Sequence, residues 1–216
     1  MSTKVDKSVS RCQAGDCRDN GTKAMDKREH LVCTALSLFY RHGIHAVGIN
    51  RVLEESGVAK KTLYHHFESK EALVMAALEH RDEIYLEWFG ERLARVPAGS
   101  RGVAELFRAL DDWFNGRVEK LSPFNGCFFI NASAEYSDRQ HPIHRACAAH
   151  KGRVAALVRP QVDALGLSPR RAQAICETLL LLKEGATVKA HVQGDLDAAR
   201  RAGRTAGLLI DAVSGE

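Results

Sequence analysis

Apolar side chains recur every three or four residues along most of the chain after residue 25. This spacing places them on one face of a helix, whereas a half-buried strand would alternate apolar and polar residues. The first such face consists of Leu31, Val32, Ala35, Leu36, Leu38 and Phe39, and Gly43 follows as a C-terminal stop. Because no convincing run of alternating β-branched residues occurs, the pattern predicts an all-α protein.

Glycine, proline and small polar residues separate the further helices that we expect. These helices cover residues 49–56, 60–67, 69–96, 100–120, 127–136, 142–165, 169–191 and 195–213. Ser69 and Ser168 stand where N-terminal caps belong, and Pro169 occupies a first helical position, where proline is tolerated.

Two short helices joined by a glycine turn carry the most informative pattern. Val52 belongs to the apolar stripe of the first helix, and Gly57 supplies the conformational freedom of a sharp turn. Leu63 and Phe67 share one face of the second helix. Its other faces carry cations, hydroxyls and an imidazole, with no acid among them: Lys60, Lys61, Thr62, Tyr64 and His65. Such a face suits a DNA major groove, whereas an ordinary surface hairpin would mix both charge signs.

The segments 57–67 (GVAKKTLYHHF) and 69–73 (SKEAL) resemble the DNA-binding domain of the TetR family of transcriptional regulators. The resemblance extends over residues 25–73. It implies an N-terminal three-helix helix-turn-helix DNA-binding domain and a larger C-terminal helical domain for ligand binding and dimerisation. Two departures concern packing and capping: Val47-Gly48 replace the usual Thr or Ser cap, and Leu53 replaces a small residue.

The same resemblance assigns roles to the residues that face DNA. Lys60, Lys61 and Thr62 open the recognition helix, where base edges and phosphates lie within reach. Tyr64, His65 and Lys70 are expected to hold phosphates, with Lys70 at the start of the next helix. The partner would be a double-stranded, palindromic operator bound by a homodimer.

We expect a disordered arm at residues 1–24, the DNA-binding domain at 25–73 and an effector-binding and dimerisation domain at 74–216. The boundary between the two folded units lies inside the expected fourth helix, which can transmit a displacement from one unit to the other. Net charge supports this division, because residues 1–70 carry 12 Lys and Arg against 8 Asp and Glu, while the remainder carries 19 of each. The excess positive charge therefore lies beside the DNA-reading segment.

The sequence predicts no membrane association. No apolar run, 178–182 included, reaches the roughly 18 residues of a membrane span. The N-terminus has charges but no apolar stretch after them, so we do not expect a secretion signal and place the protein in the cytoplasm. Cys12 and Cys17 lack a second nearby His or Cys pair, so we expect no zinc site and no cofactor.

The family resemblance implies that residues 75–190 enclose a cavity for a small effector. Aromatic residues in this region suit an apolar or aromatic ligand, although they are equally suited to an ordinary core. The candidate pocket residues are Phe107, Trp113, Phe114, Cys127, Phe128 and Tyr136. Cys127 opens a short expected helix, where a thiol can become reactive, so it is also a candidate sensor of electrophiles or oxidants.

The last two helices are expected to form the dimer interface, as in the family that the chain resembles. Small residues permit close helix approach, and the candidates are Ala199, Ala202, Gly203 and Ala206. The alternative is that these helices only complete the core of one subunit.

Catalysis is not expected, although His144, Cys147 and His150 fall three residues apart and share one helix face. They have no carboxylate on the same turns, and the chain contains no Gly-rich phosphate loop or nucleophile elbow. The sequence therefore indicates a DNA-binding repressor released by a small molecule. An enzyme that uses the His/Cys group and an architectural DNA binder without sequence preference remain the alternatives.

Overall fold

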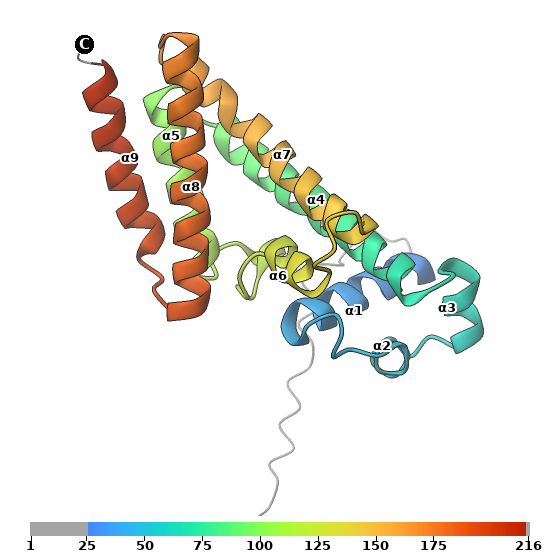
Figure 1. The fold of residues 1–216 in the computed structure, drawn as a ribbon. Helices are drawn as coiled ribbons and strands as arrows, with labels where there is room; N and C mark the ends of the chain where they lie inside the picture. The colour runs from blue at the N-terminus through green and yellow to red at the C-terminus, as the bar shows by residue number, and fades with distance from the viewer. Residues whose placement is uncertain (1–25, 215–216) are drawn as a thin grey trace, which may run out of the picture.

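The computed structural model describes residues 26–214, and this part of the chain folds into helices with no strand (Figure 1). The helices are α1 (Lys27–His42), α2 (Ile49–Ser56), α3 (Lys60–His66), α4 (Lys70–Ala94), α5 (Ser100–Phe114), the 3₁₀-helix η1 (Glu119–Leu121), α6 (Phe128–Glu135), α7 (Pro142–Asp163), α8 (Pro169–Gln193) and α9 (Ala198–Ser214). The prediction of an all-α protein is confirmed. The arm predicted at residues 1–24, with Cys12 and Cys17, lies outside the described residues.

Local sequence signals explain several helix ends. The Ser69 hydroxyl accepts a hydrogen bond from the Ala72 amide at 3.1 Å, so it caps α4 as its position suggests. Gly57 and Gly194 end α2 and α8 with φ near 66°, a left-handed conformation that glycine adopts without steric cost.

The expectation of a continuous helix over residues 100–120 is wrong. Helix α5 ends at Phe114, where the Asn115 side-chain amide donates to the Asp111 carbonyl at 2.9 Å. Gly116 then adopts a φ of 69°, which turns the chain before η1. A local side-chain hydrogen bond and a glycine thus outweigh the apolar periodicity that suggested a longer helix.

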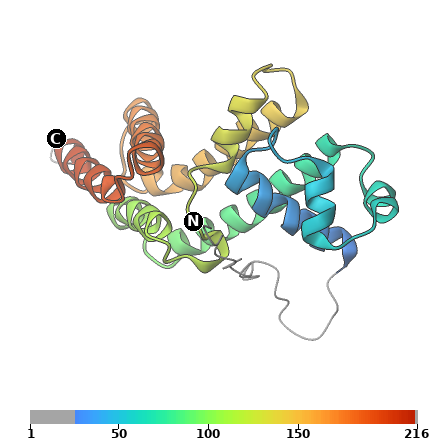
Figure 2. The same ribbon diagram turned by 90° about the horizontal axis from the view of Figure 1, so that it is seen from below.

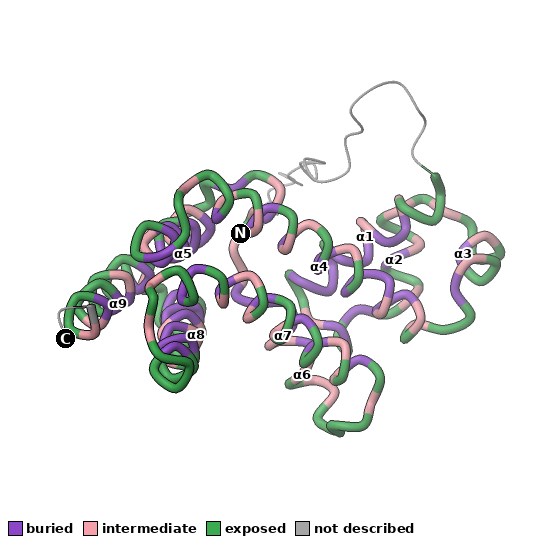
Figure 3. The backbone as a smooth tube through the Cα atoms, turned by 90° about the horizontal axis from the view of Figure 1, so that it is seen from above, coloured by how far each residue is buried: buried purple, intermediate pink, exposed green. Residues whose placement is uncertain are grey.

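The molecule is elongated, with α1, α2 and α3 at one end and α5, α8 and α9 at the other (Figures 1 and 2). Helix α4 spans 25 residues without a break and connects the two ends. Helix α7 packs along α4, and α6 packs on α7 close to α1 (Figure 1). Buried positions follow the inward sides of these helices (Figure 3), and they form one hydrophobic cluster that extends from Leu31 to Ile210.

The small residues of α9 face α5 inside the subunit. Ala199, Ala202 and Ala206 are buried, and a Cβ atom added to Gly203 would lie 2.9 Å from Cβ of Phe107. These residues allow close packing of α9 on α5, which is the alternative reading of their spacing. A single subunit does not test their assignment to the dimer interface, which stays a prediction.

A carboxylate from α6 holds the turn that follows α1. Glu135, the last residue of α6, accepts from the Ile44 amide at 2.7 Å and from the His45 amide at 2.6 Å. The carbonyl of Ile44 accepts from the Lys70 ammonium at 2.6 Å. One peptide segment of the turn is thus bonded to the end of α6 and to the start of α4. We call the contact between Glu135 and the two amides the Glu135 clasp.

The segment before α6 is also attached to α1. The Tyr40 hydroxyl donates to the Gly126 carbonyl at 2.7 Å and accepts from the Asn125 amide at 2.9 Å. The Arg81 guanidinium lies 4.8 Å from the Tyr40 ring centroid, a cation–π distance. Both ends of α6 are therefore tied to α1 or to the turn after it.

Replacing Glu135 by Ala removes both acceptors of the clasp, while Glu135→Gln retains one carbonyl oxygen. We expect Glu135→Ala to lower the free energy of unfolding by about 1–3 kcal/mol, since the bonds involve a charged acceptor, and Glu135→Gln to lower it less. Hydrogen exchange should accelerate at the Ile44 and His45 amides. The control is Glu83→Ala, which removes an exposed carboxylate of α4. Equal exchange at both amides in Glu135→Ala and Glu83→Ala would contradict the clasp.

Candidate nucleic-acid interface and interior cluster

Helices α2 and α3 turn their apolar sides inward, as their sequence pattern predicts. Val52 and Leu63 are fully buried and Phe67 is nearly so, while Gly57 makes the sharp turn between the helices. The side chains on the back of α3 fix its orientation against the rest of the N-terminal end, so its opposite face points outward.

The outward face of α3 carries the residues expected to read DNA. Lys60, Lys61 and His65 are exposed, Tyr64 is 47% exposed and Thr62 is half-buried. The Lys60 ammonium lies 6.0 Å from the Tyr64 ring centroid. Helix α3 itself lies at the far end of the elongated molecule (Figure 2).

Lys70 has a different environment from the other candidates. It is half-buried, and its ammonium donates to the Ile44 carbonyl. Burial lowers the pKa of Lys70, an effect that the nearby Glu135 carboxylate opposes. Lys70 therefore braces the turn after α1, and its expected phosphate contact remains a prediction that only its other N–H groups can meet.

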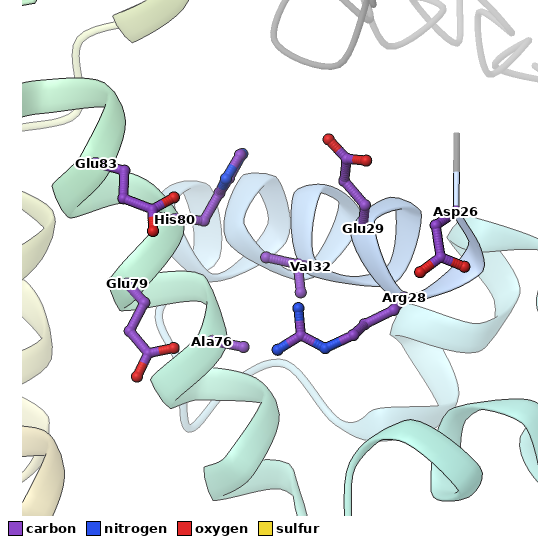
Figure 4. Close-up of a pocket in the computed structure, with 8 residues that line it drawn as sticks. All are labelled: Asp26, Arg28, Glu29, Val32, Ala76, Glu79, His80 and Glu83. Atoms are coloured by element: carbon purple, nitrogen blue, oxygen red, sulfur yellow. The ribbon is translucent and has the colours of Figure 1, made fainter. Parts of the chain in front are cut away.

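A hollow of about 340 Å³ lies between α1 and α4 (Figure 4). Its walls carry four carboxylates, together with a histidine, an arginine and two apolar residues: Asp26, Glu29, Glu79, Glu83, His80, Arg28, Val32 and Ala76. An acidic wall repels phosphates, so the hollow is no part of a DNA-binding surface. It also contains none of the residues predicted for the effector pocket.

The predicted effector residues are spread over several places. Trp113 and Phe114 pack against Phe124, with ring centroids 5.1 and 4.8 Å apart. Phe107 lies under Gly203, at the contact of α5 with α9. All three predicted residues are buried core side chains.

The other three predicted residues lie nearer the N-terminal end. Phe128 packs edge-on against Tyr40 at 5.9 Å, and the Tyr136 ring lies 5.0 Å from that of His45. Cys127 is buried, and the Lys151 ammonium donates to its sulfur at 3.5 Å. The six residues thus have several different sets of neighbours, and their assignment to one effector pocket stays a prediction.

The sequence interpretation missed a cluster of polar groups between α4, α7 and α8, in which His150, Asp82 and Lys183 are buried. His150 Nδ1 lies 2.6 Å from the Asp82 carboxylate, which also pairs with Arg153 at 2.7 Å. Nearby, the Glu184 carboxylate accepts from Lys151 at 2.7 Å and from Lys183 at 3.0 Å. Except for Lys183 and Glu184, which are adjacent, the partners of each contact lie far apart in sequence.

Two buried donors near this cluster have no hydrogen-bond partner within the described residues. They are the Tyr85 hydroxyl and the indole N–H of Trp113, whose rings lie 5.4 Å apart. Burial raises the pKa of Tyr85 well above its usual value, so its hydroxyl keeps its proton. Unpartnered buried polar groups are rare in native proteins and call for an explanation.

His144, Cys147 and His150 do not form a catalytic or metal-binding group. His144 bonds the Tyr136 carbonyl at 2.7 Å, while the His150 ring stacks on Phe129 at 3.5 Å. Burial raises the pKa of Cys147 to about 11, which keeps the thiol protonated, and burial also lowers the pKa of His150 to about 4 despite the Asp82 contact. Between residues 26 and 214, no group of three or more His, Cys, Asp or Glu side chains is arranged to hold a metal.

Helix α8 exposes apolar side chains on the face opposite to its buried stripe. Leu181 is 73% exposed and Val192 is 74% exposed, with Val188 between them at 45%. Gly185 continues the same face, and a Cβ atom there would meet nothing within 4 Å. Leu208 on the neighbouring α9 is 72% exposed. We call Leu181, Gly185, Val188 and Val192 the α8 outer strip.

None of the helices between residues 26 and 214 has both the length and the apolar character required to cross a membrane.

Two protein-family models match the chain. Residues 31–77 match the model described as bacterial regulatory proteins, tetR family, which includes most of α1 and all of α2 and α3. Residues 103–205 match the C-terminal domain of LmrA/YxaF-like transcriptional regulators. The first match ends within α4, and the second begins within α5 and ends within α9.

Individual relatives agree with these models. The structure of a TetR-family regulator from Streptomyces coelicolor is 32% identical in sequence, with a TM-score of 0.77 over 87% of this chain and 90% of that one. The regulator LmrA of Bacillus subtilis is 24% identical, covering 74% of this chain and 84% of LmrA. The Escherichia coli transcriptional repressor NemR is 28% identical over 56% of this chain and 59% of NemR, and its reduced form has been solved, with a TM-score of 0.65 over 85% of this chain and 97% of that one. This chain therefore belongs to the TetR family of transcriptional regulators.

Proposed function

We propose that this chain is a repressor that binds a palindromic operator as a homodimer and leaves it when a small molecule enters the C-terminal helices. The observation that carries the proposal is the outward face of α3, which is basic, rich in hydrogen-bonding groups and exposed at the tip of the molecule. The name of NemR as a repressor favours the same sign of regulation.

Release from DNA requires coupling between the two ends of each subunit. Two recognition helices of a dimer must match successive major grooves about 34–36 Å apart. The unbroken α4 and the Glu135 clasp attach α1–α3 to the C-terminal helices, so a shift of α4 or α6 changes the separation of the two α3 helices. The effector must bind the arrangement that does not fit DNA more tightly than the one that does, because equal affinity shifts nothing.

The first test of this proposal concerns α3. We expect Lys61→Ala to weaken operator binding about tenfold or more, and to reduce the salt dependence by about one unit of slope if the lost contact is a phosphate. The measurement is fluorescence anisotropy at several salt concentrations, with an operator selected by the wild-type protein from random DNA. Arg170→Ala removes an exposed cation at the start of α8 and serves as the control. A Lys61→Ala protein that binds like Arg170→Ala would show that α3 does not read the operator.

A second copy of this chain is the proposed occupant of the α8 outer strip. The strip and Leu208 leave large apolar side chains in solvent at the end remote from α3, where they would be buried by a two-fold partner. We expect Leu181→Glu to give monomers by light scattering, with the helical circular dichroism retained and operator affinity reduced. Ala156→Glu, on an exposed position of α7, should remain dimeric. A dimeric Leu181→Glu protein would rule out this interface.

A redox or electrophile trigger at Cys127 is the second candidate function. The specific observation in its favour is the Lys151 ammonium on the Cys127 sulfur, at the start of the helix that ends in the Glu135 clasp. The solved NemR is described as a reduced form, which fits a relative that responds to oxidation.

The test uses N-ethylmaleimide on protein carrying Cys12→Ser, Cys17→Ser and Cys33→Ser. The thiol adds across the maleimide double bond, forming an S–C bond and moving its proton to carbon. We expect this adduct to release the operator from that protein and from its Cys176→Ser derivative, and to have no effect after Cys127→Ser. Full release from the Cys127→Ser protein would exclude Cys127 as the trigger.

A further inference from the structure

Helix α8 places a lysine in the middle of its buried stripe. The inward positions of α8 are Ala172, Ile175, Cys176, Leu179, Lys183, Ala186, Thr187 and Ala190. Lys183 is only 2% exposed, and its ammonium lies 5.9 Å from the Tyr85 ring centroid. A buried ammonium is costly unless an anion or several acceptors compensate it.

Positive charge exceeds negative charge around this lysine. Lys183 and Lys151 share one carboxylate, Glu184, whose two oxygens each accept from one ammonium. Although burial opposes it, the two ammoniums lower the pKa of Glu184, which keeps the carboxylate ionised. The other nearby carboxylate, Asp82, already contacts His150 and Arg153. The Lys151–Glu184–Lys183 group therefore carries a net charge of about +1, and Lys183 is its buried member.

Hydrogen-bond donors are also in excess. The indole N–H of Trp113 can only donate, and the buried hydroxyl of Tyr85 has no partner among the described residues. Tyr85 is surrounded by other ring-bearing side chains. Its ring centroid lies 5.4 to 5.5 Å from those of Trp88, Trp113 and His150. Apolar surface, two unpaired donors and two ammoniums that share one carboxylate thus converge from α4, α5, α7 and α8.

We propose that these helices bind an organic anion, an aromatic or apolar carboxylate, with its carboxylate on Lys183 and its acceptor oxygens within reach of Tyr85 and Trp113. The carboxylate supplies the missing negative charge and acceptors, and the aromatic residues contact the apolar body. The identity of this anion as the effector rests on the proposed ligand-responsive function. Binding of the anion itself does not.

The test compares aromatic carboxylates, from benzoate to 4-phenylbenzoate, with their neutral amides of nearly equal shape. Calorimetry on the full-length protein without DNA should show at least one carboxylate binding tenfold or more tightly than its amide. Lys183→Met should abolish this preference, and Tyr85→Phe should reduce carboxylate affinity severalfold. Lys189→Met, which removes an exposed lysine of the same helix, should leave it unchanged.

A second measurement checks the charge argument without any ligand. If Lys183 is an uncompensated buried charge, Lys183→Met should raise the melting temperature of the ligand-free protein, whereas loss of a structural ion pair would lower it. The proposal is overturned if no carboxylate binds more tightly than its amide, or if Lys183→Met keeps the preference or lowers the melting temperature.

The operator assay separates this proposal from the proposed function. Carboxylates that bind through Lys183 but leave the operator complex intact would support the anion site and count against ligand-controlled repression. Release of the operator by an amide as readily as by its acid would support ligand-controlled repression and overturn the anion site.

Discussion

The relation between the two ends of the molecule depends on the carboxylate of Glu135, which accepts from the Ile44 and His45 amides. These bonds fix the turn between α1 and α2, and thereby the position of α2 and α3 relative to α6. Tyr40 anchors the other end of α6, and Phe129 within α6 stacks on His150 of α7. Helix α6 therefore connects the C-terminal helices to the α1–α3 end by specific polar contacts, in addition to the covalent route through α4.

The N-terminal end could be predicted from sequence because its determinants are local. Gly57 makes the turn, Leu63 and Phe67 fix which side of α3 is buried, and Ser69 caps the next helix. Each of these signals acts within one or two turns of helix. The wrong prediction of a continuous helix over residues 100–120 also has a local cause. The Asn115 hydrogen bond at the end of α5 depends on a side-chain orientation that the sequence does not give.

The interior of the C-terminal helices could not be predicted in the same way. Glu135 and Ile44 are 91 residues apart, and His150 and Asp82 are 68 apart. The spacing of residues within one helix therefore cannot predict either contact. In α8 the apolar run at residues 179–182 covers several faces of the helix, so the sequence does not show which side faces inward. Lys183 is buried while Leu181 is exposed, the reverse of what their hydropathies suggest. In α9 the spacing of small residues is equally compatible with packing inside a subunit and between subunits, and it does not reveal that Gly203 lies against Phe107 within the subunit.

The proposed anion site and the proposed dimer interface together explain why Lys183 is buried and Leu181 is exposed in α8. Residues two apart on a helix lie about 200° apart around its axis, so Lys183 and Leu181 point in nearly opposite directions. A polar residue in a core position and an apolar residue in solvent each cost free energy in an isolated, ligand-free subunit. Both costs are offset when an anion meets Lys183 and a second subunit covers the α8 outer strip. Because one rigid helix carries both surfaces, a ligand that displaces α8 from within also displaces the surface on which the partner rests, and the angle between subunits changes with the occupancy of the interior.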